Sequence, residues 1–188
     1  MPDPGLEDLE NLLAGGASPA GTSAETVDIG RKFGRAVFST AAEAWGAFLG
    51  KRLVYEEGET SCHQPADALA NIPPQVIVTR FQWRGEQATE YYMVMPAILV
   101  KELVAHFLAL AAGREAEPAA QRLDDEAMEA YRELVNTLAG QATVALAKEF
   151  GEGAAFSQVE SRLVDFATSP PALEFGRHER ICHACRLT

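Results

Sequence analysis

The sequence predicts an α+β domain with a mainly antiparallel sheet flanked by long helices. Three observations lead to this class. Three segments repeat apolar residues at helical spacing, two neighbouring segments alternate like the strands of a hairpin, and further strand-like segments follow the last helix. The resulting order is helix, strands, helix, helix, strands, which is typical of helices packed on an antiparallel sheet.

The first helix is expected from Ile29 to Leu49, followed by a candidate strand from Leu53 to Thr60 and a proline-containing loop. Gln75 to Trp83 and Ala88 to Met95 form a predicted hairpin around a turn at residues 84–86.

Pro96 opens a second helix, from Ala97 to Ala112. Its expected inward residues are Ile98, Leu99, Leu103, Phe107 and Leu110. A longer third helix is predicted from Leu123 to Phe150, and strands from Ala154 to Phe166 and from Ala172 to Leu187.

Two segments indicate a weak internal duplication. FLGKRLVYEEG (Phe48 to Gly58) and EFGEGAAFSQVES (Glu149 to Ser161) each end a long helix at a glycine and lead into a strand. This is the pattern expected of a fold with two related halves.

The first 26 residues are predicted to be a flexible segment that precedes a domain over residues 27–188. A short amphipathic peptide opens this segment, with leucines at helical spacing among acidic residues: Leu6, Leu9, Leu12 and Leu13. Ala14 to Thr26 are small and polar, as in a linker.

Composition narrows the function classes. Of 188 residues, 47% are hydrophobic and 23% charged, so a normal core is expected. The net charge of -11 and the absence of a basic patch argue against a nucleic-acid groove. No apolar run approaches the roughly 18 residues of a membrane span, the start does not resemble a signal peptide, and three cysteines do not form a disulfide framework. We therefore expect a cytoplasmic protein.

The third helix carries a polar stripe opposite its apolar face. At 100° per residue, Glu129, Glu133, Asn136 and Gly140 align on one side. A glycine inside a helix costs roughly 1 kcal/mol relative to alanine, and close approach of another chain is one reason to tolerate it. Polar residues also line the outer face of any amphipathic helix, so periodicity alone assigns this stripe no function.

The segment EAYRELVNTLAGQATVAL, from Glu129 to Leu146, resembles the signature helix of the CheC/CheX/FliY chemotaxis phosphatases. Glu133 and Asn136 match the two key positions of that helix. Glu129 stands where the family has Asp or Ser, and Gly140 matches the small-residue stretch. By the order of elements, the resemblance covers roughly residues 28–187.

The equivalent places on the first helix hold Lys32 and Arg35, so that helix carries no second Glu/Asn pair. One site per chain is more similar to CheX than to the two-site members. The leucine peptide at residues 6–13 resembles the opening peptide of FliM and FliY, which captures phosphorylated CheY.

The resemblance implies a hydrolase that removes phosphate from the phosphoaspartate of a CheY-type response regulator. Asn136 would orient the attacking water, and Glu133 would pair with a lysine of the regulator. Glu129, Gly140 and the leucine peptide would bind this partner. Mg²⁺ would be held by the regulator, with no cofactor bound by this chain. The alternative is a non-catalytic component of the flagellar switch in the manner of FliM, with flagellar switch proteins as partners.

A metal site is a competing interpretation of the sequence. Cysteine and histidine occur together in Cys182-His183-Ala184-Cys185, and Cys62 and His63 lie upstream. Neighbouring side chains on a strand face opposite ways, so Cys182 and His183 do not easily share one ion. Small residues in a terminal strand are the preferred interpretation, and no metal site is expected. A Cys62–His63 nucleophile and base pair is also disfavoured, because no third group is evident.

Self-association is a further expectation. Gln75 to Trp83 is rich in β-forming residues, and an exposed edge there would pair with a second copy. CheX-like proteins pair through their sheets, so the resemblance also implies a homodimer.

Overall fold

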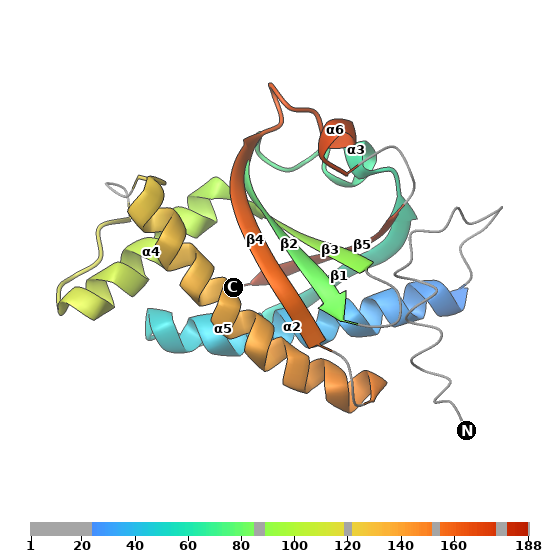
Figure 1. The fold of residues 1–188 in the computed structure, drawn as a ribbon, viewed down its shortest axis with the longest axis horizontal. Coiled ribbons are helices and arrows are strands. Elements are labelled where there is room, and N and C mark those ends of the chain that lie inside the picture. The colour runs from blue at the N-terminus through green and yellow to red at the C-terminus, as the bar shows by residue number, and fades with distance from the viewer. Residues whose placement is uncertain (1–23, 85–88, 119–121, 152–154, 176–179, 188) are drawn as a thin grey trace.

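Figure 1 shows the computed structural model of the chain, which describes residues 24–84, 89–118, 122–151, 155–175 and 180–187. Two halves share one order of elements: a long helix, a strand, a short helix and another strand. The first half comprises α2 (Ala24–Leu49), β1 (Tyr55–His63), α3 (Pro65–Ala68) and β2 (Gln75–Arg84), and adds β3 (Thr89–Pro96). The second comprises α5 (Asp125–Phe150), β4 (Ala155–Asp165), α6 (Pro171–Phe175) and β5 (Arg180–Leu187), and α4 (Ala97–Ala112) precedes it.

Strand pairing crosses between the halves. β1 pairs antiparallel with β5 and β2 pairs antiparallel with β4, so the first strand of each half pairs with the second strand of the other. β3 joins β2, which gives a three-stranded sheet, β3-β2-β4, and a two-stranded sheet, β1-β5. This exchange is what a duplicated unit with approximate two-fold symmetry produces. The predicted α+β class is confirmed, with the strands divided between two sheets.

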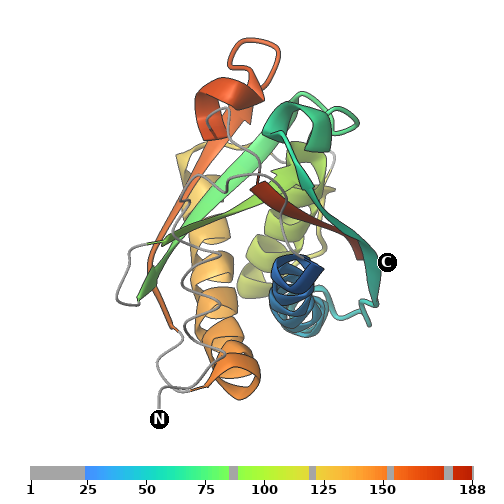
Figure 2. The ribbon, with the colours of Figure 1, turned by 90° about the vertical axis from the view of Figure 1, so that its right-hand side faces the viewer.

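The long helices cover one face of the three-stranded sheet, and α3 and α6 lie side by side near the other face (Figures 1 and 2). The main core lies between the sheet and the helices and includes Phe33, Trp45, Ile77, Phe81, Val100, Tyr131, Leu134 and Leu138. A smaller core under the short helices contains Val76, Val78, Val164 and Phe175. Among the described residues, no helix is both long enough and apolar enough to span a membrane.

Several predicted boundaries are wrong. α2 begins at Ala24 rather than Ile29 and so takes up the last residues of the predicted linker. A short helix, α3, forms in the predicted loop, and α6 replaces the beginning of the strand predicted from Ala172. Each of these short helices begins with a proline, which suits a first helical position because its ring fixes φ and no amide hydrogen is needed there.

The predicted inward face of α4 is partly wrong. Ile98 and Leu110 are 66% and 62% exposed, and Leu99 is exposed as well. Apart from Leu103, the buried residues of α4 are small or β-branched: Ala97, Val100, Val104, Ala105 and Ala109. Because α4 is apolar on most sides, periodicity does not select which side faces the core.

The expected edge strand is central. β2 lies between β3 and β4 in the three-stranded sheet, so both of its edges are already paired. A dimer contact through this strand is therefore excluded, while the homodimer itself stays a prediction.

Candidate functional site

The third long helix predicted from sequence is α5, and its ends are well defined. The Asp124 carboxylate accepts a hydrogen bond from the Ala127 amide at 3.1 Å, which satisfies one of the free amides of the first turn. Gly151, with a φ of 92°, follows the last turn. The buried face agrees with the prediction and includes Tyr131, Leu134, Val135, Leu138, Ala142 and Leu146.

A buried group of hydroxyls sets the rotation of α5 on the sheet. The Tyr131 hydroxyl lies 3.3 Å from Thr79 Oγ1 on β2, which in turn lies 3.0 Å from Ser161 Oγ on β4. Burial raises the pKa of the Tyr131 hydroxyl well above its usual range, so it stays protonated. These partners are far apart in sequence, and the sequence analysis did not find the network. By holding Tyr131 inward, the network turns the opposite side of the helix to solvent.

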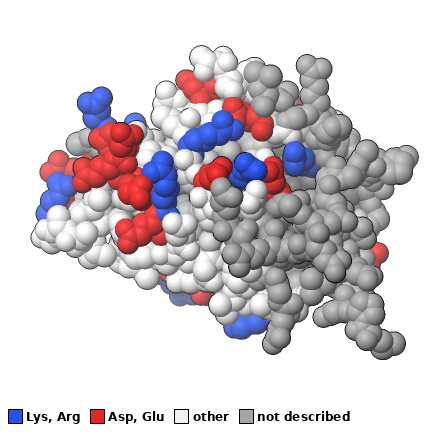
Figure 3. Space-filling model, in the orientation of Figure 1, with Lys and Arg blue, Asp and Glu red and all other residues white. Residues whose placement is uncertain are grey.

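The predicted stripe lies on that outward side: Glu129, Glu133, Asn136 and Gly140 are all exposed. Glu129 Oε2 accepts a hydrogen bond from Arg132 Nη1 at 2.7 Å, an ion pair within one turn. The Glu133 carboxylate and the Asn136 amide make no hydrogen bond to any other described residue. Both groups are therefore available to a partner. Acidic side chains gather at the left of the face in Figure 3, around α4 and the beginning of α5.

Packing within the described part of the chain does not explain why position 140 is a glycine. A Cβ built on it meets no heavy atom within 4 Å. The space beside it is open, so its cost to the helix is not offset by a close contact inside the fold.

The equivalent surface of α2 has different chemistry. Residue numbers in α5 exceed those at the same position of α2 by 101, the difference between Asp125 and Ala24, and each helix has 26 residues. This offset places Lys32 opposite Glu133 and Arg35 opposite Asn136, and both basic residues are exposed. As predicted, α2 has no Glu/Asn pair.

The cysteine and histidine motif lies on β5. Both ring nitrogens of His183 meet hydroxyls, with Nε2 2.9 Å from the Tyr55 oxygen and Nδ1 2.6 Å from Thr60 Oγ1. Burial raises the pKa of the Cys182 thiol and raises that of Cys185 to about 11. Over the described ranges, no group of three or more His, Cys, Asp or Glu residues is placed to hold a metal ion.

Cys62 and His63, upstream in the sequence, lie on opposite faces of β1. His63 Nε2 lies 2.7 Å from Ser61 Oγ on its own strand, two residues away and therefore on the same face. Cys62 is adjacent in sequence and lies on the other face, so the structure gives no support to a Cys62–His63 pair.

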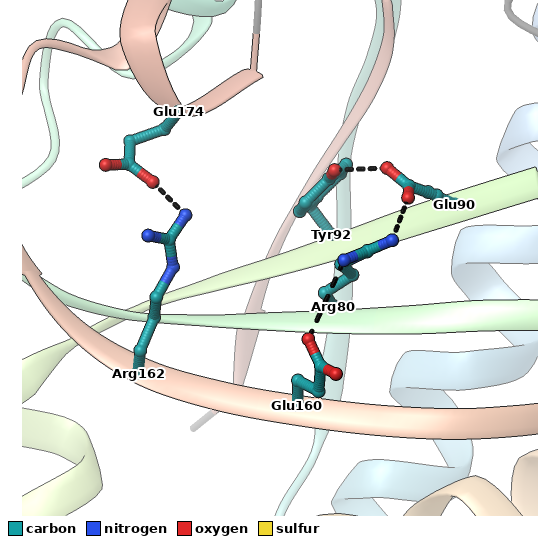
Figure 4. A network of polar contacts seen from close by, with 6 residues as sticks. All are labelled: Arg80, Glu90, Tyr92, Glu160, Arg162 and Glu174. Carbon is teal, nitrogen blue, oxygen red and sulfur yellow. Dashed lines mark hydrogen bonds and ion pairs between the residues drawn. The ribbon is translucent and has the colours of Figure 1, made fainter.

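A second polar region lies on the outer face of the three-stranded sheet and was missed by the sequence analysis (Figure 4). Arg80 pairs with Glu90, and its Nη1 lies 3.6 Å from Glu160 Oε2. The other contacts are Tyr92 with Glu90 and Arg162 with Glu174. They border a hollow of about 590 Å³. Because each of these arginines faces a carboxylate, we interpret the contacts as structural. Arg80 links β2 to β3 and β4, and Arg162 links β4 to α6.

No family model and no curated protein matches the sequence. Solved structures do match the fold. FliY of Thermotoga maritima has a TM-score of 0.68 at 14% identity, over 89% of this chain and 90% of that chain.

Two structures of FliM complexes from H. pylori are also similar. The FliM–SpeE complex gives a TM-score of 0.65 at 6% identity, over 89% of this chain and 83% of that one. The FliG–FliM complex gives 0.63 at 6% identity, over 89% and 87%. At these identities the likeness concerns the fold alone. The chain therefore has the fold of the CheC/CheX/FliY family.

Proposed function

We propose that this chain is a phosphatase acting on the phosphoaspartate of a CheY-type response regulator. One observation carries the proposal: Glu133 and Asn136 lie together on the exposed side of α5, unpaired with other described residues, in a FliY-like fold. A helix fixed by buried hydroxyls presents both groups on a rigid surface.

The reaction needs a water molecule placed in line with the phosphorus–oxygen bond. Hydrolysis of an acyl phosphate requires little covalent chemistry from the protein, so positioning of the nucleophile dominates. An amide both donates and accepts hydrogen bonds, and the Asn136 amide can therefore hold a neutral water. Mg²⁺ would be bound by the regulator's own carboxylates, and the active site would be shared between the two proteins.

The other residues of the stripe would bind the regulator. Glu133 would pair with a lysine beside the phosphorylation site, while Glu129 would contact the partner through its free carboxylate oxygen. Gly140 lets a partner approach the helix closely, because it has no side chain and a Cβ built there would meet open space.

A phosphate-release assay tests the proposal. Adding the chain to a phosphorylated CheY-type regulator should accelerate phosphate release. Glu133→Ala should weaken regulator binding, because a charged partner of a lysine is lost. Glu149→Ala removes an exposed carboxylate from the last turn of the same helix and should leave binding unchanged. Absence of any acceleration by the wild type would contradict the enzyme proposal.

A non-catalytic switch component is the second candidate. The observation favouring it is the similarity to FliM in two complexes, which include one with FliG. This function predicts binding to flagellar switch proteins, together with regulator binding that leaves the phosphate lifetime unchanged.

The leucine peptide would serve either function by tethering the phosphorylated regulator. Leu6, Leu9, Leu12 and Leu13 lie outside the described residues. Deleting residues 1–23 leaves α2 complete and should weaken regulator binding without altering the thermal unfolding midpoint. Unchanged affinity would remove this role from the peptide.

A further inference from the structure

Arg132 is a basic side chain beside the two groups of the candidate site. It directly precedes Glu133, and Asn136 follows it by four residues, which makes Arg132 and Asn136 neighbours on the helix surface. α5 contains two basic residues, Arg132 and Lys148, and at 1.5 Å per residue Lys148 lies about 18 Å along the axis from Asn136. Arg132 is therefore the positive charge of α5 that a group bound at Asn136 would meet.

The direction of helical side chains supports this placement. A side chain on an α-helix leans toward the N-terminus of the helix, so it covers the turn that precedes its own Cα. Asn136 therefore lies over the turn that contains Arg132 and Glu133. A phosphoryl group held near the Asn136 amide would lie over the same turn, within reach of the long Arg132 side chain.

Most hydrogen-bond donors of Arg132 are unused. Its side chain is 45% exposed, and its Nη1 lies 2.7 Å from Glu129 Oε2. No further hydrogen bond or ion pair joins Arg132 to another described residue, so most of the five N–H groups of its guanidinium remain available. Glu129 is 76% exposed, and an ion pair so open to solvent is weak. The guanidinium can therefore turn toward a partner at little cost.

The charges around Asn136 explain why a cation is needed there. Glu129 and Glu133 are acidic and a phosphoryl group carries negative charge, so the two carboxylates alone would repel it. A guanidinium matches the geometry of phosphate oxygens and can bind two of them through parallel hydrogen bonds. Arg132 can therefore offset the repulsion and make the phosphorylated form of a regulator the better ligand.

We propose that Arg132 contacts the phosphoryl group of a phosphorylated CheY-type regulator and gives the α5 surface its preference for that form. The inference rests on the proposed function in one respect, namely that the regulator docks on α5 at Asn136. It applies to the phosphatase and to the non-catalytic switch component, because both functions require the phosphorylated regulator to be distinguished from the unphosphorylated one.

The ratio of two dissociation constants tests this role. The full chain is titrated with the unmodified regulator, and with regulator whose acceptor aspartate carries beryllium trifluoride, a stable substitute for the phosphoryl group. The wild type should bind the second form more tightly. Arg132→Gln should reduce this preference by roughly ten-fold or more, as expected for the loss of a charge-assisted hydrogen bond, and should leave binding of the unmodified regulator unchanged. Arg132→Lys should retain part of the preference, because it keeps the charge.

Arg31→Gln is the matched control. Arg31 forms the equivalent ion pair with Asp28 on α2, and its loss changes the net charge equally, so the preference should persist. All variants keep the leucine peptide, so the differences between them do not include its contribution. The inference is overturned if Arg132→Gln keeps the wild-type preference, if Arg31→Gln loses it equally, or if the wild type binds both forms alike.

A phosphate-release assay on the wild type distinguishes failure of this inference from failure of the proposed function. A wild type that prefers the beryllium trifluoride form through Arg132, but does not accelerate phosphate release, would contradict the phosphatase and support the inference. Accelerated release together with an unchanged preference in Arg132→Gln would support the phosphatase and overturn the inference. A wild type that binds neither form would contradict both.

Discussion

The two long helices, α2 and α5, show which positions the fold fixes and which it leaves free. Both have 26 residues, both are followed by a glycine with positive φ, and six positions at the 101-residue offset are buried in both helices. Phe33 and Val37 correspond in this way to Leu134 and Leu138. The exposed positions instead diverge in charge. The comparison teaches that packing constrains one side of each helix, and that function can be sought on the other.

The helices also contact their strands differently. On α2, Gly30 and Gly34 let β5 approach so closely that an added Cβ would lie 2.4 Å from Ile181 or from the His183 ring. On α5 the position equivalent to Gly30 is Tyr131, whose hydroxyl reaches Thr79 in β2. Thus α2 makes room for side chains of β5, whereas α5 extends the Tyr131 side chain toward β2.

The largest expected effect concerns the shared buried face. Leu138→Ala should lower the free energy of unfolding by about 2–5 kcal/mol, because Leu138 is fully buried and its loss leaves a cavity. Val37→Ala at the equivalent place on α2 should also destabilise, but by less, since fewer methyl groups are removed. Urea denaturation measures both.

Val144→Ala is the control on the same helix. Val144 is 59% exposed, so its truncation should change the unfolding free energy by no more than about 0.5 kcal/mol. Equal losses for Val144→Ala and Leu138→Ala would contradict the assignment of the two faces.

Two helical glycines should respond in opposite directions to the same substitution. Gly34→Ala should destabilise by about 1–3 kcal/mol through overpacking against His183, less the gain of up to about 1 kcal/mol in helix propensity. Gly140→Ala meets open space and should stabilise by up to about 1 kcal/mol. Thermal unfolding of both variants distinguishes them. A destabilised Gly140→Ala would show that this surface is not open.

Local patterns predicted the long helices well, because each has a period that its own residues define. The ends of α4 agree with the prediction, and α5 begins two residues after the predicted Leu123. The side of α4 that faces the core could not be predicted, because Ile98 and Leu110 are as apolar as the buried residues of this helix. Only the position of α4 in the fold decides between these sides.

The features that the sequence did not predict depend on contacts between segments that are distant in the chain. β2 was expected at an edge, but its neighbours are set by pairing with β4, roughly 80 residues away by register (Thr79 with Ser161). The Arg80 network likewise joins side chains from separate strands. At the candidate site, the sequence predicted that Glu133 and Asn136 are exposed, whereas the hydroxyl network beneath them depends on two strands.

A smaller effect on stability should come from pH. Lowering the pH should weaken the contact of α2 with β5 more than the contact of α5 with β2 and β4. Desolvation lowers the pKa of His183 below its ordinary value of 6.5, while the nearby Glu57 opposes the shift. The unfolded chain then takes up a proton at pH values where the folded chain does not. The stability from neutral His183 is complete above pH 6.5 and is lost as the pH falls from there toward the lower folded pKa.

His183→Gln should reduce the slope of unfolding free energy against pH in that range. Hydrogen exchange should also show α2 opening more readily than α5 as the pH falls, because the contact of α5 with Thr79 and Ser161 involves hydroxyls only. An unchanged slope in the variant would contradict this account of His183.

The central claim is that α5 carries a catalytic surface on which Asn136 orients the attacking water. Phosphate release from a phosphorylated CheY-type regulator, compared for wild type, Asn136→Ala and Gln141→Ala, tests it most directly. Gln141 is an exposed amide on the same helix outside the stripe. Asn136→Ala should remove most of the acceleration while regulator binding and stability persist, and Gln141→Ala should keep the wild-type rate. An Asn136→Ala protein that releases phosphate as fast as the wild type would contradict the claim.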